Sequence, residues 1–268
     1  MPRNSLDQQW LRDGLISPWR HLDVVAETGS TNADLLARAA AGEDIDGIVL
    51  IAEHQTAGRG RNGRSWWATP RAQITLSVGV NAGDVPAAGW GWLPLTTGIA
   101  VVDAVAAVTG VEAGLKWPND VLAGDGKLAG ILAEVAPQRS AIVVGIGLNV
   151  TLRPDEVGCP GVTSLHELGV EQPDRDQLVR RLLHELADRI THWRAVEGAD
   201  ERLIADYRAR SLTVGSRVRA ILPGGREMVG TARSVDEQGR LRIECDGDTT
   251  AVSAGDVVHL RPVRRPGP

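Results

Sequence analysis

The segment between Gln55 and Trp66 holds the densest group of residues in this chain that could bind an anion. Three arginines alternate there with three glycines: Gly58, Arg59, Gly60, Arg61, Gly63 and Arg64. Glycines let a backbone turn sharply and come close to a ligand, and guanidinium groups bind phosphate oxygens through paired hydrogen bonds. Closely spaced like charges repel one another, so we expect a mobile loop that a phosphate-bearing ligand would order. An ordinary solvated basic loop is the alternative.

The three glycines also match the dinucleotide-binding pattern G-x-G-x-x-G. That motif requires a helix to begin at the glycines, so that the N-terminus of the helix faces the pyrophosphate. Here the loop continues into Trp66-Trp67-Ala68-Thr69-Pro70 and then into a strand-like segment, and no helix fits. The sequence therefore does not predict a Rossmann domain.

Lysine is nearly absent from the chain, and its placement is informative. Of 29 basic residues only Lys116 and Lys127 are lysine, and both lie in turns rich in glycine, proline and asparagine. Lysine carries a compact charge on a flexible stem, whereas arginine offers a planar fork. We expect both lysines to serve a site, although two residues can also cluster by chance.

Each lysine belongs to a short motif. In Lys116-Trp117-Pro118-Asn119-Asp120 the amide could contact a nucleobase edge, and the carboxylate could bind Mg²⁺ or orient a lysine. In Gly126-Lys127-Leu128-Ala129-Gly130-Ile131-Leu132 the lysine precedes a buried strand and could contact a phosphate or a carbonyl, although the P-loop spacing is missing. A Pro-Asn-Asp turn with a buried tryptophan and a surface lysine at a hairpin are the structural alternatives.

Two more segments carry possible ligand contacts. Gly145 and Gly147 interrupt a buried strand, which indicates that something packs closely on it, and Asn149 at the end of this strand could meet an adenine. A β-bulge without a ligand is the alternative. Ser30, Thr31 and Asn32 stand at the start of a helix, where hydroxyl groups usually cap the helix. Capping is compatible with neighbouring residues that face a cleft.

The hydrophobic pattern predicts an α/β (α+β) domain followed by a small all-β module. We expect a surface arm over residues 1–20, a catalytic domain over 21–210, the β-module of about five strands over 211–262 and a disordered tail over 263–268. Within the catalytic domain, strands are predicted at 21–26, 47–54, 73–80, 115–117, 128–135 and 140–150, and helices at 32–41, 86–109, 174–196 and 200–210.

Composition excludes several classes of protein. A net charge of −5 argues against nucleic-acid binding through bulk positive charge. No signal-peptide pattern is visible at the start, and we expect that no uncharged apolar run approaches the length of a membrane span. Cys159 and Cys245 lie far apart without a metal-binding or disulfide pattern, which favours a reducing, cytoplasmic setting. The motifs of metallohydrolases and of catalytic triads are missing.

Together and in this order, the segments resemble the biotin–protein ligase family. The resemblance rests on Ser30 to Asn32, Gln55, the glycine-arginine loop through Trp66, Lys116 to Asp120, Gly126 to Leu132 and Gly145 to Asn149. It covers about residues 21–262, and the loop paired with Lys-Trp-Pro-Asn-Asp is highly specific. The fold it implies is a mixed β-sheet flanked by helices, of the class II synthetase-like biotin and lipoate ligase type, followed by an SH3-like barrel.

The resemblance also implies an activity and the residues that perform it. Biotin and MgATP would give biotinyl-5′-AMP, and a lysine of a biotin carboxyl carrier domain of a carboxylase would then accept the biotin. Biotin would be held by Ser30, Thr31, Asn32, Gln55, Arg59, Gly60, Arg61, Lys127 and Gly130. ATP or the adenylate would be held by Gly58, Arg61, Arg64, Trp66, Asn119, Lys127 and Asn149. Catalytic roles fall to Lys127, Arg61, Asp120 and Lys116. No metal ligand is assigned, because Mg²⁺ would arrive with ATP.

One departure from part of the family limits the expected partners. Some members carry an N-terminal helix-turn-helix and repress transcription, whereas about twenty residues precede the first predicted strand here. We therefore expect a ligase without a repressor role and without DNA as a partner. We also expect no membrane partner, and a protein that is a monomer or a weak homodimer. The alternatives are a lipoate or octanoate ligase of the same fold and a non-catalytic biotin or nucleotide sensor.

Overall fold

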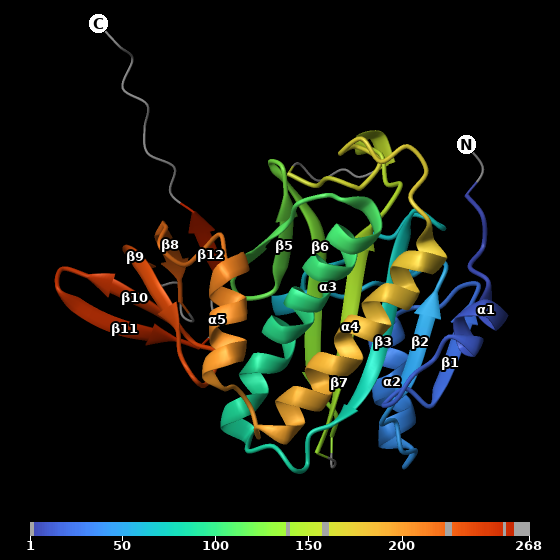
Figure 1. Ribbon diagram of the computed structural model, residues 1–268, viewed down its shortest axis with the longest axis horizontal. Coiled ribbons are helices and arrows are strands. Elements are labelled where there is room, and N and C mark those ends of the chain that lie inside the picture. Colours follow the sequence, from blue (N-terminus) through green and yellow to red (C-terminus); the bar gives the residue numbers. More distant parts are fainter. Residues whose placement is uncertain (1–2, 138–139, 157–160, 223–226, 254–255, 260–268) are drawn as a thin grey trace, which may run out of the picture.

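A computed structural model describes residues 3–137, 140–156, 161–222, 227–253 and 256–259. Seven strands form one mixed sheet in the order β1-β2-β3-β7-β6-β5-β4 (Figure 1). β1 and β2 are parallel, and the other neighbours in the sheet are antiparallel. The strands are β1 (His21–Val25), β2 (Ile48–Ala52), β3 (Gln73–Asn81), β4 (Gly114–Lys116), β5 (Asp120–Ala123), β6 (Gly126–Val135) and β7 (Ala141–Asn149).

Helices cover both faces of this sheet. The helices are α1 (Gln8–Asp13), α2 (Thr31–Ala40), α3 (Leu93–Thr109), α4 (Arg175–Ala195) and α5 (Glu201–Arg210). In Figure 1, α3 and α4 lie in front of the sheet and α2 lies behind it. Side chains alternate along a strand, so in β2 Ile51 packs into the core under α3 and α4, whereas Leu50 packs into the smaller core under α2. The predicted α/β class is confirmed.

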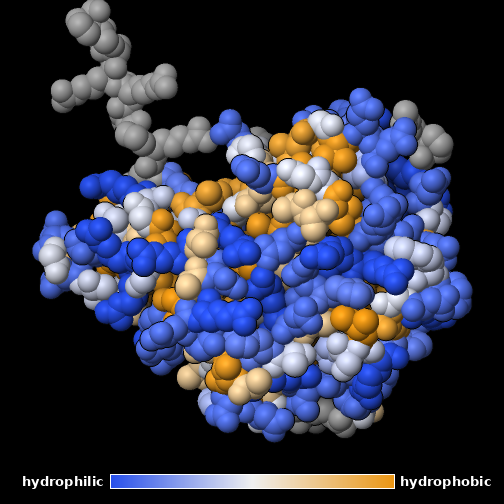
Figure 2. Space-filling view, viewed as in Figure 1, coloured by the Kyte–Doolittle hydropathy of each residue, from blue (hydrophilic) through white to orange (hydrophobic). Residues whose placement is uncertain are grey.

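The central helix corrects one expectation about apolar runs. Ala87–Thr109, which joins a 3₁₀ turn to α3, is long and apolar enough to cross a membrane by length and composition alone. However, 67% of its most apolar window is buried inside the protein. α4 packs along it, and the visible face of this helical layer is mostly hydrophilic (Figure 2). Burial of most of this helix therefore explains its apolar composition, as expected for a core helix.

The segment before β1 is packed against the domain and is not a loose surface arm. Three of its side chains are buried, those of Leu6, Leu11 and Trp19. Gln8 Oε1 accepts the Val24 N–H, and Arg12 Nε donates to the Leu22 carbonyl, both at 2.7 Å. These bonds occupy outward-facing backbone groups of the edge strand β1, which otherwise would be open to pairing with another chain. The apolar residues are too few to show a period, so the sequence did not reveal their burial.

The remaining elements agree with the sequence except at β5. β5 (Asp120–Ala123) was not among the predicted strands, because four residues are too few to show an alternating pattern. The C-terminal module has the expected five strands, in the order β11-β10-β9-β8-β12. They are β8 (Arg217–Ile221), β9 (Glu227–Val235), β10 (Leu241–Cys245), β11 (Asp248–Val252) and β12 (Asp256–His259). The predicted tail, 263–268, lies outside the described residues.

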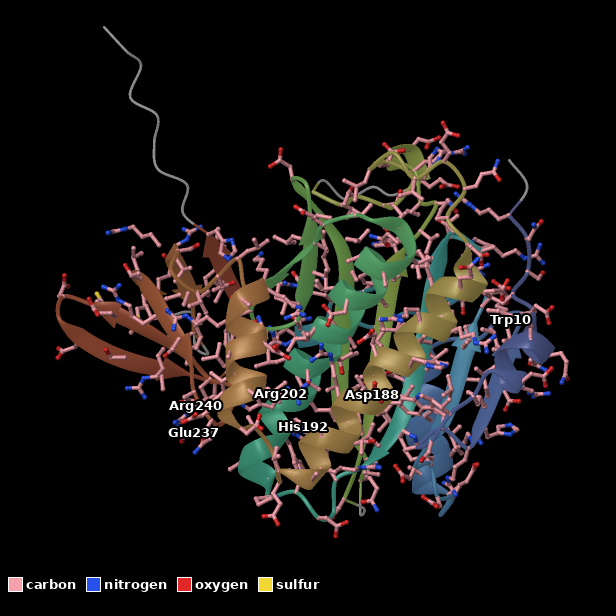
Figure 3. All side chains as sticks on the ribbon, in the orientation of Figure 1. Trp10, Asp188, His192, Arg202, Glu237 and Arg240 are labelled. Atoms are coloured by element: carbon pink, nitrogen blue, oxygen red, sulfur yellow. The ribbon has the colours of Figure 1, made fainter. Side chains whose placement is uncertain are left out.

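The turn between β9 and β10 joins the C-terminal module to the domain that contains the seven-stranded sheet. The indole of Trp92 donates to the Asp236 carbonyl at 2.9 Å, and the indole of Trp117 donates to the Gly239 carbonyl at 3.0 Å. Glu237 and Arg240 of the same hairpin are labelled in Figure 3. Trp117 belongs to the Lys116–Asp120 motif. The C-terminal module therefore contacts a segment for which the sequence predicted a functional role.

Candidate active site

A cavity of about 490 Å³ collects the residues that the sequence had singled out. It lies on the α2 face of the large sheet, beside the start of α2. Ser77, Gly145 and Leu132 form one row of the register there, and Thr75, Gly147 and Gly130 form the next. Small residues in these rows leave the space that larger side chains would fill. Every predicted site residue except Gly58 lines it: Ser30, Thr31, Asn32, Gln55, Arg59, Gly60, Arg61, Arg64, Trp66, Lys116, Asn119, Asp120, Lys127, Gly130 and Asn149.

At one end of the cavity, four buried side chains form a polar box. Its members are Thr31, Asn32, Gln55 and Ser77. The backbone N–H and the hydroxyl of Thr31 both donate to Gln55 Oε1, at 2.8 and 3.1 Å. Ser77 Oγ lies 2.6 Å from the Thr31 hydroxyl and donates to Asn32 Oδ1, also at 2.6 Å. Ser30 caps α2, as predicted, by accepting the Ala33 N–H. The box is therefore held together by internal hydrogen bonds, and its hydroxyl and amide groups include both donors and acceptors.

The sequence missed Ser77, although one signal was present. Ser77 is a hydroxyl within the otherwise apolar run of β3, at a position with no exposed surface. A buried hydroxyl needs a hydrogen-bond partner, and only the folding of α2 onto β3 shows that its partners are Thr31 and Asn32.

Glu134 is a second residue that the sequence did not single out. Its Oε2 accepts from Asn32 Nδ2 at 2.8 Å, and its Oε1 lies 3.4 Å from Arg59 Nη2. The carboxylate thus connects the polar box with the glycine-arginine loop. The amide of Asn32 lies against Gly145, where an added Cβ would come within 2.2 Å of Asn32 Oδ1. The prediction that something packs closely on the glycines of β7 is confirmed here.

The glycine-arginine loop closes on itself over the cavity. The Gly60 N–H donates to the Arg64 carbonyl at 2.7 Å, and the Trp66 N–H donates to the Gly58 carbonyl at 2.8 Å. Its helical content is a single 3₁₀ turn, Arg61–Gly63, which agrees with the rejection of a Rossmann motif. An added Cβ at Gly58 would lie 2.4 Å from the Trp66 carbonyl. Gly58 therefore permits the loop to close, and it does not line the cavity.

Trp66 lines the cavity, and its indole ring packs against the glycines of β6 and β7. An added Cβ at Gly147 would lie 2.4 Å from two atoms of the indole, and one at Gly130 would lie 3.0 Å from it. The amine of Lys127 lies 5.5 Å from the ring centroid, within the range of a cation–π contact. The indole nitrogen is buried and has no hydrogen-bond partner among the described residues. The absence of side chains at Gly147 and Gly130 is therefore what admits Trp66.

Lys127 and Asp120 form an ion pair in the cavity, with Nζ 2.6 Å from Oδ1. They come from the adjacent strands β6 and β5, in whose register Asp120 faces Gly130. Arg61 Nη1 donates to Asn119 Oδ1 at 3.1 Å, so the loop reaches the same motif. Asp120 is the one acidic residue among the described lining residues, against five cations: Arg59, Arg61, Arg64, Lys116 and Lys127. This excess of positive charge suits a polyanion. Within the described residues, no group of three or more His, Cys, Asp or Glu side chains could hold a metal.

Asn149 lines the cavity, yet its amide is already engaged. Its Nδ2 donates to the carbonyls of Lys127 and Thr163, at 3.2 and 3.0 Å, and its Oδ1 accepts from Gln73 Nε2 at 2.8 Å. The side chain is buried, and these bonds hold the backbone that carries Lys127. A contact between Asn149 and an adenine stays a prediction, and it would have to replace one of these bonds.

The C-terminal module contributes to the cavity, which the sequence did not show. Ile221, Val257 and Val258 are among the lining residues. The Trp117 N–H donates to Thr213 Oγ1 at 3.0 Å, and that hydroxyl lies 2.9 Å from His259 Nε2. Burial, and secondarily the nearby charge of Lys116, lowers the pKa of His259 below its ordinary value. The module therefore holds the backbone of the Lys116–Asp120 motif through the hydrogen bond between Trp117 and Thr213.

A carboxylate-activating ligase is the class of protein that this fold and this cation-rich site define. Two family models match the chain: the biotin/lipoate A/B protein ligase family over residues 28–150, and the biotin protein ligase C-terminal domain over residues 213–260. The chain belongs to the biotin–protein ligase family, as the relatives and solved structures below also indicate.

Among curated proteins, a biotin–[acetyl-CoA-carboxylase] ligase of Mycobacterium tuberculosis is 64% identical over 97% of both chains. The bifunctional ligase/repressor BirA of Escherichia coli is 34% identical over 87% of this chain and 72% of its own length. Among solved structures, the biotin protein ligase of Aquifex aeolicus in complex with biotin and ATP matches with a TM-score of 0.77 and 26% identity, covering 91% of this chain and 100% of that one. The ligase of Leishmania major in complex with biotinyl-5-AMP matches with a TM-score of 0.62 and 25% identity, over 89% and 100%.

Proposed function

We propose that this protein is an ATP-dependent biotin–protein ligase. A biotin carboxylate oxygen attacks the α-phosphorus of ATP, the bond to the β-phosphate breaks, and biotinyl-5′-AMP and pyrophosphate form. The ε-amine of a carrier lysine then attacks the carbonyl of this mixed anhydride, an amide forms, and AMP leaves. The carrier is a biotin carboxyl carrier domain, of acetyl-CoA carboxylase by similarity to the Mycobacterium tuberculosis relative.

One observation carries the proposal: three of the four side chains of the polar box, those of Thr31, Asn32 and Gln55, line the same cavity as the Lys127–Asp120 pair and the loop arginines. The ureido ring of biotin has one carbonyl acceptor and two N–H donors, which matches the hydroxyls and amides of the box. With the ring in the box, the valeryl carboxylate extends toward Lys127. Ligase structures of the family contain biotin with ATP or biotinyl-5-AMP, which supports the same pairing of ligands here.

The chemistry assigned to these side chains is positioning and charge neutralisation. Lys127 holds the biotin carboxylate against the α-phosphate and offsets the negative charge that builds on phosphorus, an effect strongest in a site that excludes water. Arg61 and Arg64 bind the outer phosphates, and Lys116 adds positive charge from β4. Asp120 orients Lys127 and later receives a proton from the incoming lysine amine. The substrates supply both nucleophiles, so no enzyme nucleophile is required.

Mg²⁺ is part of the proposal as a companion of ATP. Asp120 is the carboxylate in the described lining, and one carboxylate together with substrate phosphates and water is a common Mg²⁺ environment. The ion would shield the phosphates during attack, while the arginines of the loop hold them in place.

A pyrophosphate-exchange assay tests the proposal. Purified protein should exchange labelled pyrophosphate into ATP when biotin is present, and should label a carrier domain after ATP is added. Lipoate in place of biotin should support neither step. Exchange with lipoate and not with biotin would establish the lipoate or octanoate ligase. Ligand binding without exchange would establish the non-catalytic sensor.

Three further expectations belong to the same proposal. The protein acts in the cytoplasm, where carboxylases and ATP are available. It does not repress transcription, and specific binding to a promoter fragment at physiological salt would contradict this. It is a monomer or a weak homodimer, which sedimentation at several concentrations measures. The side chains of α1 that occupy the edge of β1 favour a monomer at that edge.

A further inference from the structure

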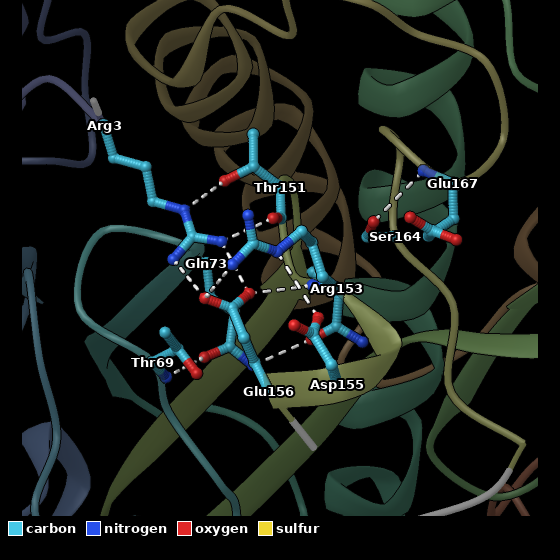
Figure 4. Close-up of polar contacts among 10 residues, drawn as sticks. Arg3, Thr69, Gln73, Thr151, Arg153, Asp155, Glu156, Ser164 and Glu167 are labelled. Carbon is cyan, nitrogen blue, oxygen red and sulfur yellow. Dashed lines mark hydrogen bonds and ion pairs between the residues drawn. The ribbon is translucent and has the colours of Figure 1, made fainter. Parts of the chain in front are cut away.

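Arg3 ties together the two ends of a turn that is 148 residues away in the sequence. Its Nε donates to Thr151 Oγ1 at 2.9 Å, and its Nη2 donates to the Thr151 carbonyl at 2.7 Å (Figure 4). Its Nη1 and Nη2 donate to the two carboxylate oxygens of Glu156, at 2.9 and 2.6 Å. Glu156 also accepts the Arg153 N–H at 2.9 Å. One guanidinium therefore fixes the first and the last residue of the turn 151–156.

The contact between Arg3 and Glu156 is more than a surface ion pair. The side chains are only 20% and 18% exposed, and the two carboxylate oxygens meet the arginine fork in a bidentate arrangement. The hydrogen bond from Arg3 is the main cause that lowers the pKa of Glu156. A planar guanidinium can make these bonds at once, which a lysine ammonium in the same place cannot do.

The backbone next to Arg3 is anchored in the domain by a buried ion pair. Arg175 and Glu53 meet at 2.5 Å, and each side chain is 8% exposed. Glu53 accepts the Leu6 N–H at 2.6 Å, and Arg175 donates to the Asn4 carbonyl at 3.1 Å. The backbone that carries Arg3 is therefore fixed to the domain, so the guanidinium holds the turn in a defined place.

The turn 151–156 forms part of the wall of the active-site cavity. Leu152, buried within the turn, is a lining residue, and so is Val162 further along the chain. The Lys127 N–H donates to the Gly161 carbonyl at 2.8 Å, so this wall adjoins the backbone of Lys127. Together with Trp66, these side chains give the lining apolar surface, and none of them belongs to the polar box. A planar nucleobase, and not the ureido ring, suits such a surface.

We propose that Arg3 is a positioning residue for the nucleotide: it holds the turn 151–156 so that Leu152 keeps its place in the wall. Arg3 does not line the cavity, so its effect on ATP passes through Thr151 and Glu156. The inference rests on the proposed function, since it names what controls the nucleotide end of the same site.

Steady-state pyrophosphate exchange with Arg3→Ala tests this. We expect the KM for ATP to rise roughly tenfold, within the range of couplings that pass through contacts. The kcat and the KM for biotin should stay within about twofold of the wild-type values, because the polar box and Lys127 do not contact the turn side chains that Arg3 holds. Arg3→Lys should not restore the affinity for ATP, because an ammonium does not reproduce the fork.

Arg12→Ala is the matched control. Arg12 lies in the same N-terminal segment and bonds the Leu22 carbonyl and Asp23, away from the turn. It should leave the KM for ATP unchanged. If Arg3→Ala fails to fold, Thr151→Val and Glu156→Gln remove acceptors of the same fork and should each raise the KM for ATP. Combining Glu156→Gln with Arg3→Ala should add little to Arg3→Ala alone.

Three results would overturn the role of Arg3: an unchanged KM for ATP, a parallel rise in the KM for biotin, or the same effect in Arg12→Ala. Failure of the proposed function has a different signature, since the wild-type protein would then show no biotin-dependent exchange. In that case calorimetric titration of wild type and Arg3→Ala with MgATP still decides the inference, because it measures affinity for the nucleotide without turnover.

Discussion

Lys127 Nζ lies 2.6 Å from Asp120 Oδ1, on adjacent strands of one hairpin, with the two side chains 31% and 22% exposed. The pair holds the lysine amine beside the ring of Trp66, in the cavity that the loop arginines also line. An α-phosphate that binds the amine competes with the carboxylate for it. Adenylate formation would therefore free Asp120 at the moment when an amine nucleophile needs a proton acceptor, which links the two half-reactions through one ion pair.

Replacing Lys127 should separate catalysis from folding. In the proposed mechanism, Lys127→Ala removes the positive charge that offsets the negative charge developing on phosphorus, and losing one such electrostatic contact lowers kcat by about 10²–10³-fold. Lys127→Arg should retain part of the activity. The melting temperature should change little, because the side chain is partly exposed. Exchange at the wild-type rate in Lys127→Ala would remove this residue from the mechanism.

Asp120→Asn should impair transfer more than adenylation. The amide keeps the shape of the carboxylate but cannot accept a proton, and general base catalysis typically contributes about 10²–10⁴-fold. Single-turnover transfer from preformed biotinyl-5′-AMP to a carrier domain should therefore slow much more than pyrophosphate exchange does. An equal loss in the two assays would instead indicate that Asp120 serves only to orient Lys127.

Gly147→Ala should displace Trp66. The new methyl group would lie 2.4 Å from the indole, and overpacking of this kind costs about 1–3 kcal/mol. We expect weaker binding of ATP and a lower melting temperature. Gly29→Ala is the control, since nothing lies within 4 Å of its added Cβ. Normal affinity for ATP in Gly147→Ala would show that the position of Trp66 does not matter for the nucleotide.

Trp117→Phe and Trp92→Phe should differ in function while costing similar stability. Each removes one indole hydrogen bond to the turn between β9 and β10, worth about 1 kcal/mol. Only Trp117 lies in the motif with Lys116 and Asp120, so only Trp117→Phe should also raise the KM for ATP. Chemical denaturation and exchange kinetics of both variants measure the two effects. Identical kinetics would mean that the C-terminal module stabilises the fold without supporting the site.

His259 should make the stability of the C-terminal module depend on pH. Its folded-state pKa is lowered from the ordinary value of 6.5, chiefly by burial. The unfolded chain therefore takes up the proton more readily, so this contribution to stability is fully present above pH 6.5 and falls as the pH drops toward the folded pKa. His259→Gln keeps an acceptor for Thr213 without titrating, and its denaturation midpoint should fall less on acidification. Parallel pH profiles for variant and wild type would contradict this.

Local features of the chain could be predicted because their causes are local. The glycine-arginine loop, the two lysine motifs and the capping of α2 by Ser30 depend on residue type and short spacing. Ser77 and Glu134 could not be identified as site residues, since each gains its role from a partner on another element: Ser77 from α2, and Glu134 from both α2 and the loop. Asn149 is the opposite case: the sequence marked it as a ligand contact, whereas its amide donates to the backbone carbonyls of Lys127 and Thr163.

The sequence by itself determined most of the strands and helices, though not α1 or β5, together with the family and most of the residues that line the cavity. Hydrophobic period, turn chemistry and motif spacing are local properties of the chain, which is why they could be identified. Only the tertiary structure decided that Asn32 and Trp66 pack against the glycines of β7 and that Lys127 pairs with Asp120. It also decided that Trp117 donates a hydrogen bond to the C-terminal module and that Arg3 holds the turn that follows Asn149. Each of these contacts joins residues on different elements, and their separation along the chain does not indicate that they meet. Packing density and the need to pair buried polar groups select them only after the elements have come together.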